Sequence, residues 1–300
     1  MIRMPLATAS LLAIAISLAG CGEGDKEKAA APAPAASTAA APAAAPAAAG
    51  KVDEAAAKAV VAHYADIVFA VYSDAESTAK TLQTAVDTFL AKPNADTLKA
   101  AKAAWVAARV PYLQSEVFRF GNTIVDDWEG QLNSWPLDEG LIDYVDKSYE
   151  HALGNPGATA NIIANTQVQI GEDKVDVKDI TPEKLASLNE LGGSEANVAT
   201  GYHAVEFLLW GQDLNGTGPG NGNRPASDYN TKKCTGGHCD RRAQYLHAAT
   251  DLLVDDLAWM AAQWAPSGEA RKTIEDGSAE AGLTAILTGL GSLSYGELAG

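Results

Sequence analysis

The fold of this chain is decided by one stretch of its sequence, Gly201-Tyr202-His203-Ala204-Val205-Glu206-Phe207-Leu208-Leu209-Trp210-Gly211. The stretch predicts a helix, because no proline interrupts it, Ser194 offers an N-cap before it, and Gly211 offers a left-handed stop after its last apolar residue. Apolar side chains surround the predicted helix on nearly every side. A helix of this kind is typical of the interior of a helical bundle.

Two polar side chains, His203 and Glu206, interrupt this apolar surface. They stand three residues apart, so both leave the same face of the helix. A carboxylate buried there without a partner would cost several kcal/mol, so Glu206 needs a metal ion, a cationic side chain or a proton. An imidazole with a carboxylate suits iron or zinc better than magnesium or calcium. A His–Glu hydrogen bond that only fixes the helix packing is an equally good interpretation of these residues.

The first 50 residues are typical of export and anchoring signals rather than of a folded core. Residues 1–20 carry Arg3 as their only charge and an apolar run from Leu11 to Leu18, which is too short to span a membrane as a mature helix and predicts a secretory signal. The following Cys21 completes a phrase that resembles the lipobox of bacterial lipoproteins, in which the cysteine carries the lipid. Residues 21–50 are rich in alanine and proline and predict an extended spacer, so the folded region is expected at residues 51–300.

The charge of the chain excludes one large class of partners. The formal net charge is −16, and it becomes −17 when residues 1–20, which hold Arg3 and no acidic residue, are removed. A protein this acidic lacks the basic surface that binds nucleic acid, but it can attract cations.

The two cysteines that remain beside Cys21 lie close together in the sequence, at Cys234 and Cys239. In an exported protein, neighbouring cysteines form a disulfide more often than a metal site. With no second pair to complete a zinc site, the sequence predicts a disulfide between them.

Helical periodicity extends over most of the folded region, so the predicted fold class is all-α. Further helices are expected at residues 58–90, 96–120, 240–264 and 279–290. Residues 121–140 and 215–239 are expected to be loops, and no strand-rich region competes with the helices.

The second of these predicted helices places Tyr112, Glu116 and Arg119 in one stripe, beside a proline that is expected to kink it. Two ligands do not make a metal site, so Glu116 is the most plausible third ligand beside the His-x-x-Glu pair. Asp138 or Glu139, in the acidic loop that follows, could supply a fourth. Tyr112 and Arg119 are expected next to the ligands, while a packing adjustment at the kink without any site remains the alternative.

Four phrases of the sequence resemble the imelysin family, and within it the iron-regulated protein A branch. They are Gly201-x-His203-x-x-Glu206, the phrase from Val110 to Phe120, Trp135-Pro136-Leu137-Asp138-Glu139, and Gly291-Ser292-Leu293-Ser294-Tyr295-Gly296-Glu297-Leu298. The resemblance implies two helical-bundle halves with the signature helix at their junction, in proteins that continue beyond residue 300, so the second half is expected to be incomplete here. It carries over His203 and Glu206 through the signature, and Glu116 and Arg119 through the helix phrase.

The resemblance implies an exported lipoprotein that binds iron, or zinc or another divalent metal, as part of iron acquisition. Lipid on Cys21 would anchor it in the bacterial cell envelope, on the outer membrane facing the periplasm or the surface, with a metal-uptake protein as a partner. The family's name also implies a metallopeptidase with Glu206 as its base. Phe207 stands where the inverted zinc motif His-x-x-Glu-His needs its second histidine, which favours binding over hydrolysis. A structural adhesin without metal is the third interpretation.

Overall fold

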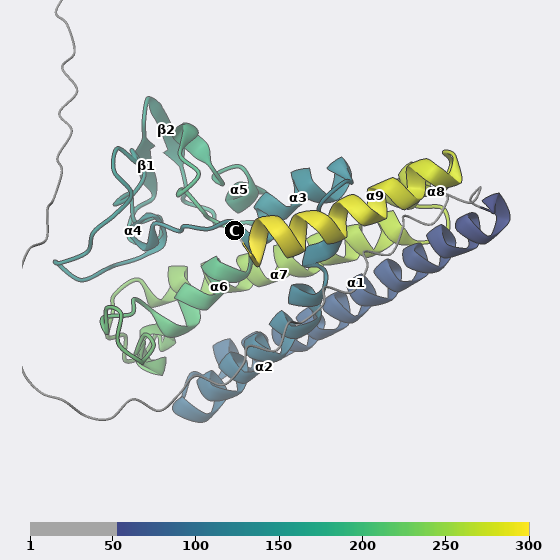
Figure 1. The fold of residues 1–300 in the computed structure, drawn as a ribbon. Helices are drawn as coiled ribbons and strands as arrows, with labels where there is room; N and C mark the ends of the chain where they lie inside the picture. The colour runs from purple at the N-terminus through teal and green to yellow at the C-terminus, as the bar shows by residue number, and fades with distance from the viewer. Residues whose placement is uncertain (1–52, 300) are drawn as a thin grey trace, which may run out of the picture. The chain divides into compact units, whose positions relative to one another are not determined.

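The computed structural model describes residues 53–299. The predicted signal, Cys21 and the spacer lie outside the described residues, so their assignment stays a prediction. The described part is mainly helical, with 61% helix, and its two short strands pair as one antiparallel hairpin (Figure 1). The predicted all-α class is therefore confirmed. Its elements are α1 (Glu54–Ala91), α2 (Ala95–Gln114), η1 (Glu116–Phe118), α3 (Thr123–Asn133), α4 (Glu139–Ile142), β1 (Gln167–Ile170), β2 (Asp173–Asp176), α5 (Pro182–Ala186), η2 (Leu191–Gly193), α6 (Gly201–Trp210), η3 (Ala226–Tyr229), α7 (Cys239–Trp264), α8 (Glu269–Glu275), α9 (Ala279–Gly291) and η4 (Ser292–Glu297).

Two long helices, α1 and α2, form a hairpin along one side of the bundle (Figure 1). The Asp53 side chain caps α1, and Asn94 and Thr97 form a capping box at the start of α2, so each helix begins where a side chain satisfies free N–H groups. Apolar residues at helical spacing from Val61 to Phe89 are buried and pack α1 against α2 and α7. By length and composition alone α1 could also cross a membrane, but its buried stripe is used for this packing.

Helix α6 is the one predicted from the opening stretch, and it contacts α2, α3 and α7. Seven of its ten residues are buried, which agrees with the predicted interior position. It begins at Gly201 after Thr200, so the predicted N-cap at Ser194 is wrong. The residues just before α6 do not continue the helix, since the Ala199 N–H bonds the side chain of Asn189 at 3.0 Å instead of a helical carbonyl.

Gly201 joins α6 to the end of α3 by a very close backbone approach. Its φ angle is +76°, in the left-handed region that side chains rarely adopt. A Cβ atom at this position would clash with the carbonyl oxygen of Leu132 and would lie 2.8 Å from that of Gln131. Only glycine allows the two backbones to meet here.

Two predicted boundaries in the first half are wrong. α2 ends at Gln114, and Glu116 lies in the separate turn η1, because the Ser115 hydroxyl and N–H both bond the Tyr112 carbonyl and close the helix. Residues 121–140, predicted as a loop, contain α3 and the first two residues of α4. The buried residues of α3, Val125, Trp128 and Leu132, follow a spacing of three and four that an acidic stretch conceals.

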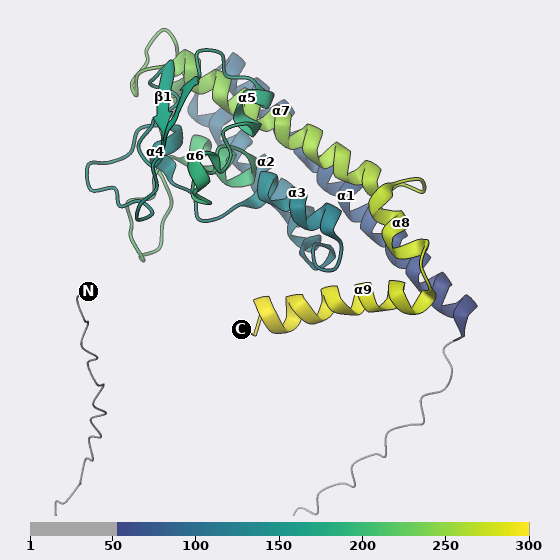
Figure 2. The same cartoon turned by 90° about the horizontal axis from the view of Figure 1, so that it is seen from above.

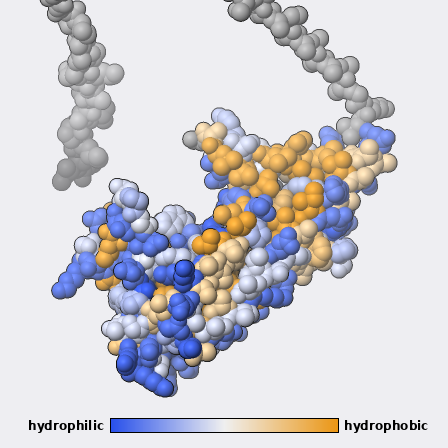
Figure 3. Space-filling view, turned by 90° about the horizontal axis from the view of Figure 1, so that it is seen from below, coloured by the Kyte–Doolittle hydropathy of each residue, from blue (hydrophilic) through white to orange (hydrophobic). Residues whose placement is uncertain are grey.

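The last long helix, α9, packs through small residues. Gly282 lies against Val61 of α1, and Gly289 lies against the Val117 carbonyl of η1. Figure 2 shows α9 running back from α8 beside the bundle. Large apolar side chains remain exposed on α1, α2 and α9, and Figure 3 shows a broad hydrophobic area on the face seen from below. Those exposed residues are Val60, Ile67, Val106, Val110, Leu113, Leu287 and Leu290.

A buried ion network ties α7 to the segments before η3 and after α4. Arg242 donates Nε and Nη2 to the two carboxylate oxygens of Asp143, at 2.6 and 2.9 Å. Arg224 donates Nη1 to Asp143 at 2.6 Å and to Asp228 at 3.5 Å. No side chain of the four is more than 1% exposed. The charges of the two cations and the two carboxylates therefore cancel in an interior that water does not reach.

The predicted disulfide is present in the structure. Cys234 and Cys239 are bonded, with their Cα atoms 5.9 Å apart, and they close the loop directly before α7. The carbonyl of Gly237, inside this loop, accepts a hydrogen bond from Arg242 Nη1 at 2.8 Å. The disulfide loop thus also supplies a hydrogen-bond acceptor to Arg242 of the ion network.

Candidate functional site

The His203–Glu206 pair lies on the outer side of α6. Nδ1 of His203 is 3.1 Å from Oε2 of Glu206, and the side chains are 19% and 43% exposed. The expectation that Glu206 is buried is therefore wrong, because the polar stripe of an otherwise apolar helix faces the surface. Its carboxylate remains partly solvated and can meet an ion from outside.

An exposed aromatic ring covers the imidazole. The ring of Trp135 lies 5.2 Å from that of His203, and Trp135 itself is 71% exposed. Trp135 also lines a cavity, so it contacts both His203 and the cavity's group of polar residues.

Glu139, at the start of α4, belongs to the surroundings of the pair. Burial raises its pKa to about 7, with Asp213 and Glu206 adding to the rise and Arg224 opposing it. The charges of Glu206 and Asp213 thus act on Glu139, although within residues 53–299 no three such side chains lie close enough to hold a metal ion.

We expect Glu139→Gln to stabilise the protein at alkaline pH only. A carboxyl whose pKa is raised in the folded state stabilises fully below its unfolded value of 4.5 and loses this contribution as the pH rises through about 7. After discounting for solvent screening, the variant should gain about 1–2 kcal/mol in free energy of unfolding at pH 8 and nothing at pH 4.

Urea unfolding at the two pH values measures this effect. Glu280→Gln, on the exposed side of α9, is the surface control and should behave like the wild type at both. An equal gain for Glu139→Gln at pH 4 and pH 8 would show that the carboxyl does not titrate in this range.

Asp138 has a structural role in the described residues. It is buried, and its carboxylate accepts hydrogen bonds from the Tyr149 hydroxyl at 3.0 Å, the Ala152 N–H at 3.0 Å and the Asn155 amide at 2.5 Å. These donors order the segment after α4. Its carboxylate is occupied by these donors, and its predicted place beside the ligands stays a prediction.

Glu116 and Arg119 line the cavity that Trp135 also lines. Its volume is about 400 Å³. Arg119 Nη2 bonds Glu116 at 3.0 Å and approaches Glu297 at 3.6 Å, while its Nη1 lies 3.6 Å from Glu129. Burial raises the pKa of Glu116, Arg119 lowers it, and Glu129 and Glu297 raise it again. The lining residues are Glu116, Arg119, Glu129, Asn133, Ser134, Trp135, Glu190, Glu195 and Glu297.

The predicted three-ligand set is not assembled. Within residues 53–299, no group of three His, Cys, Asp or Glu side chains is close enough to hold a metal ion. Glu116 instead pairs with Arg119, because the end of α2 at Gln114 changes its direction. Tyr112 is buried beneath this cavity, with its hydroxyl 3.5 Å from Glu129.

Sequence reasoning missed most of the acidic residues of this cavity. Glu129 lies on α3, which was predicted as a loop, and Glu190, Glu195 and Glu297 come from segments distant in the sequence. The spacing of the apolar residues in α3 could have revealed Glu129. Glu297 stands in the family phrase from Gly291 to Leu298, whereas no local signal marks Glu190 or Glu195.

The helical fold and the His-x-x-Glu signature together define the class of protein to which this chain belongs. The family model described as Imelysin matches residues 68–300, and the chain belongs to the imelysin family. The resemblance found in the sequence is thereby confirmed.

Particular relatives are similar over parts of their length. Iron-regulated protein A of Synechococcus elongatus is 34% identical over 76 residues, which are 25% of this chain and 21% of that protein. A putative iron-regulated protein A precursor from Parabacteroides distasonis aligns with a TM-score of 0.53 and 22% identity over 81% of this chain. An imelysin-like protein from Psychrobacter arcticum aligns with a TM-score of 0.54 and 18% identity over 82%. This chain covers 58% and 61% of those two solved chains, so the likeness concerns the fold of the shared part.

Proposed function

We propose that this imelysin-family protein binds a divalent metal, iron foremost and zinc or another divalent ion second, through His203 and Glu206. The observation that carries the proposal is the position of the pair, with Nδ1 and Oε2 3.1 Å apart on the solvent-facing side of a buried helix. A nitrogen and a carboxylate oxygen are donors that both metals accept. The name of the Synechococcus relative supports a connection with iron.

The residues fit a metal in part. The pair provides two donors, whereas iron and zinc take four or more. Within residues 53–299 no third His, Cys, Asp or Glu side chain is close enough to join the pair. Water would complete the coordination at so exposed a place.

The wider role that we propose is iron acquisition at the cell envelope. Lipid on Cys21 would hold the protein at the outer membrane, facing the periplasm or the surface, and the metal would pass to an uptake protein. Mass spectrometry of the exported protein for a diacylated Cys21 tests the anchor separately from the metal.

We expect His203→Ala and Glu206→Gln each to weaken binding of Fe(II) or Zn(II) by about tenfold or more, since each removes one of two protein ligands. Titration calorimetry on protein purified without chelator measures this. His247→Ala is a matched control, because His247 on α7 also faces a carboxylate, with its Nδ1 2.7 Å from Asp251, and is 53% exposed. Equal affinity in the wild type and both site variants would refute the assignment.

A second candidate is a metallopeptidase, which the peptidase label of the matching family model favours. Against it, Phe207 occupies the position of the second histidine and is only 3% exposed, turned into the core. Cleavage of an unfolded protein by the wild type, abolished in Glu206→Gln, would support hydrolysis over binding.

A further inference from the structure

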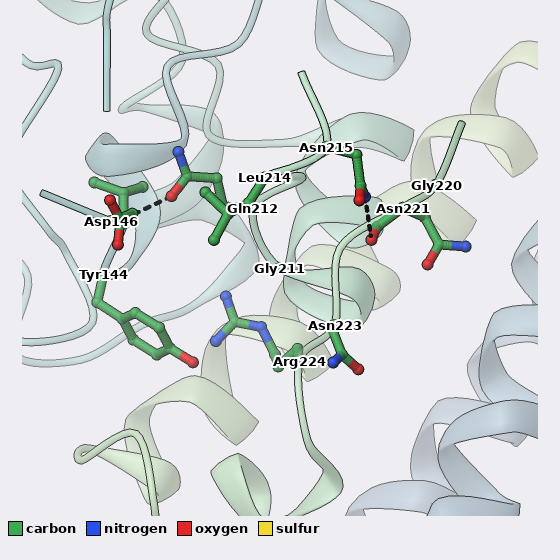
Figure 4. A pocket seen from close by; sticks show the side chains of 11 residues that line it. Tyr144, Asp146, Gly211, Gln212, Leu214, Asn215, Gly220, Asn221, Asn223 and Arg224 are labelled. Carbon is green, nitrogen blue, oxygen red and sulfur yellow. Dashed lines mark hydrogen bonds between the residues drawn. The ribbon is translucent and has the colours of Figure 1, made fainter. Parts of the chain in front are cut away.

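A second cavity lies beyond the C-terminal end of α6, separate from the acid-lined one. Its volume is about 630 Å³, within the range of small-molecule sites. Figure 4 shows it between the segment after α4 and the loop that follows α6. The residues that line it are Tyr144, Val145, Asp146, Gly211, Gln212, Leu214, Asn215, Gly220, Asn221, Asn223 and Arg224.

Arg224 gives this cavity a buried cation. The residue is 4% exposed, and its guanidinium lies between the rings of Tyr144 and Phe207, at 5.0 and 5.3 Å. Figure 4 shows it turned from the loop toward Tyr144 and Gln212. Its Nη1 serves Asp143, but Nε and Nη2 have no hydrogen-bond partner within residues 53–299 and no contact with bulk water.

Arg242 provides a comparison for the two Arg224 atoms, Nε and Nη2, that have no partner among the described residues. The Nε and Nη2 atoms of an arginine form the fork that grips a carboxylate with two parallel hydrogen bonds. In Arg242 this fork holds Asp143. In Arg224 the corresponding fork has no acceptor, and a buried charged donor without an acceptor is rare and costly.

The charges and polar groups around the fork limit the chemical class of ligand that can bind there. Asp143 and Asp228 already balance Arg224 and Arg242, and Asp146 adds a negative charge to the lining. A single carboxylate is therefore repelled less than a doubly charged phosphate. The amide side chains of Gln212, Asn215, Asn221 and Asn223 also line the cavity. Gln212 already accepts the Asp146 N–H and Asn215 already donates to Asp213, so their remaining donors and acceptors, with those of Asn221 and Asn223, can bond hydroxyl groups.

We infer that this cavity binds a small hydroxylated carboxylate, with its carboxylate on Nε and Nη2 of Arg224 and its hydroxyl groups on the amides of the loop. The site is distinct from the proposed metal pair. Water does not reach the fork, so binding requires that the atoms covering Nε and Nη2 move aside. Residues 213–221 of this loop are exposed. Asn215 bonds Asp213 and Asn221, so these hydrogen bonds lie within the loop.

Titration calorimetry on the chelator-treated protein tests the inference with glucuronate, gluconate and lactate as probes and with glucose as the neutral analogue. We expect saturable binding of at least one carboxylate with a dissociation constant of about 1 mM or below, and glucose about tenfold weaker or undetectable. No saturable binding of any of the three up to about 10 mM would overturn the inference, as would equal binding of glucose.

Two variants locate the site without depending on the ion network. Asn223→Asp adds a negative charge to an exposed residue of the lining and should weaken binding about tenfold. Thr217→Asp adds the same charge in the same loop outside the lining and should leave affinity within about twofold. Equal effects of the two would overturn the location.

Arg224→Lys tests the fork itself, since it keeps the charge and removes the paired donors. A fall of about tenfold in affinity, with a melting curve that confirms folding, is the expected result. Unchanged affinity in this variant would overturn the role of Arg224. If Arg224→Lys does not fold, the comparison of Asn223→Asp with Thr217→Asp decides.

Discussion

Replacement of Gly201 by alanine is expected to lower the free energy of unfolding by about 3 kcal/mol or more. The φ angle of +76° is strained for any residue with a Cβ, and that atom would also clash with the Leu132 carbonyl. The end of α3 would have to move away from α6, which opens packed core. Urea unfolding at neutral pH measures the loss.

Another glycine provides a control that separates backbone strain at positive φ from the steric clash of an added Cβ atom. Gly193 has the same φ of +76°, but a Cβ there would have no atom within 4 Å. Gly193→Ala should therefore cost only the backbone strain, about 1 kcal/mol. If the two variants lose equal stability, the close approach of α3 is not what requires glycine in the signature.

Asp143→Asn is the second substitution with a large expected effect, a loss of about 3–5 kcal/mol in free energy of unfolding. It removes the carboxylate shared by Arg242 and Arg224 and leaves two buried guanidinium groups facing one remaining carboxylate, that of Asp228. The neutral amide can bond them, but it cannot balance their charge. Urea unfolding at pH 7, compared with the wild type, gives the difference.

The pH dependence identifies the cause. Burial opposes ionisation of Asp143, yet hydrogen bonding and charge from Arg242 and the charge of Arg224 outweigh it, so the pKa is lowered. A lowered pKa stabilises above the unfolded value of 3.8 and loses that contribution as the pH falls through the folded value. The deficit of Asp143→Asn should therefore shrink in acid.

Asp146→Asn, three residues further on, is the control, because Asp146 is exposed and bonds only Ser148 through its carboxylate, and it should shift the unfolding midpoint far less than Asp143→Asn. A deficit for Asp143→Asn that is the same in acid as at pH 7 would mean that lost shape, not lost charge, weakens the fold.

The main helices could be predicted because their apolar spacing repeats over many turns. In α1 the pattern runs for 38 residues, and in α6 the apolar surface is nearly continuous. α3 was missed because 11 residues give only three buried positions within an acidic stretch. Short elements depend on their tertiary partners more than on their own pattern.

The candidate site could be predicted only where its members are neighbours in the sequence. His203 and Glu206 share a helix face, and Cys234 and Cys239 are five residues apart, so local rules found both pairs. The position of Glu116 depends on where α2 ends, and the hydrogen bond from the Ser115 hydroxyl to the Tyr112 carbonyl sets that end. Asp143 and Arg242 are 99 residues apart, and no periodicity connects them.

The exposed Trp135 gives the proposed metal pair a built-in optical signal. Its indole ring lies 5.2 Å from the imidazole of His203, where a protonated ring or a bound cation would meet the electron-rich aromatic face. The emission of this one tryptophan should respond to the occupancy of the pair, while buried tryptophans such as Trp264 should not. Occupancy can thus be followed in the unlabelled protein, with Trp135→Phe as the silent reference.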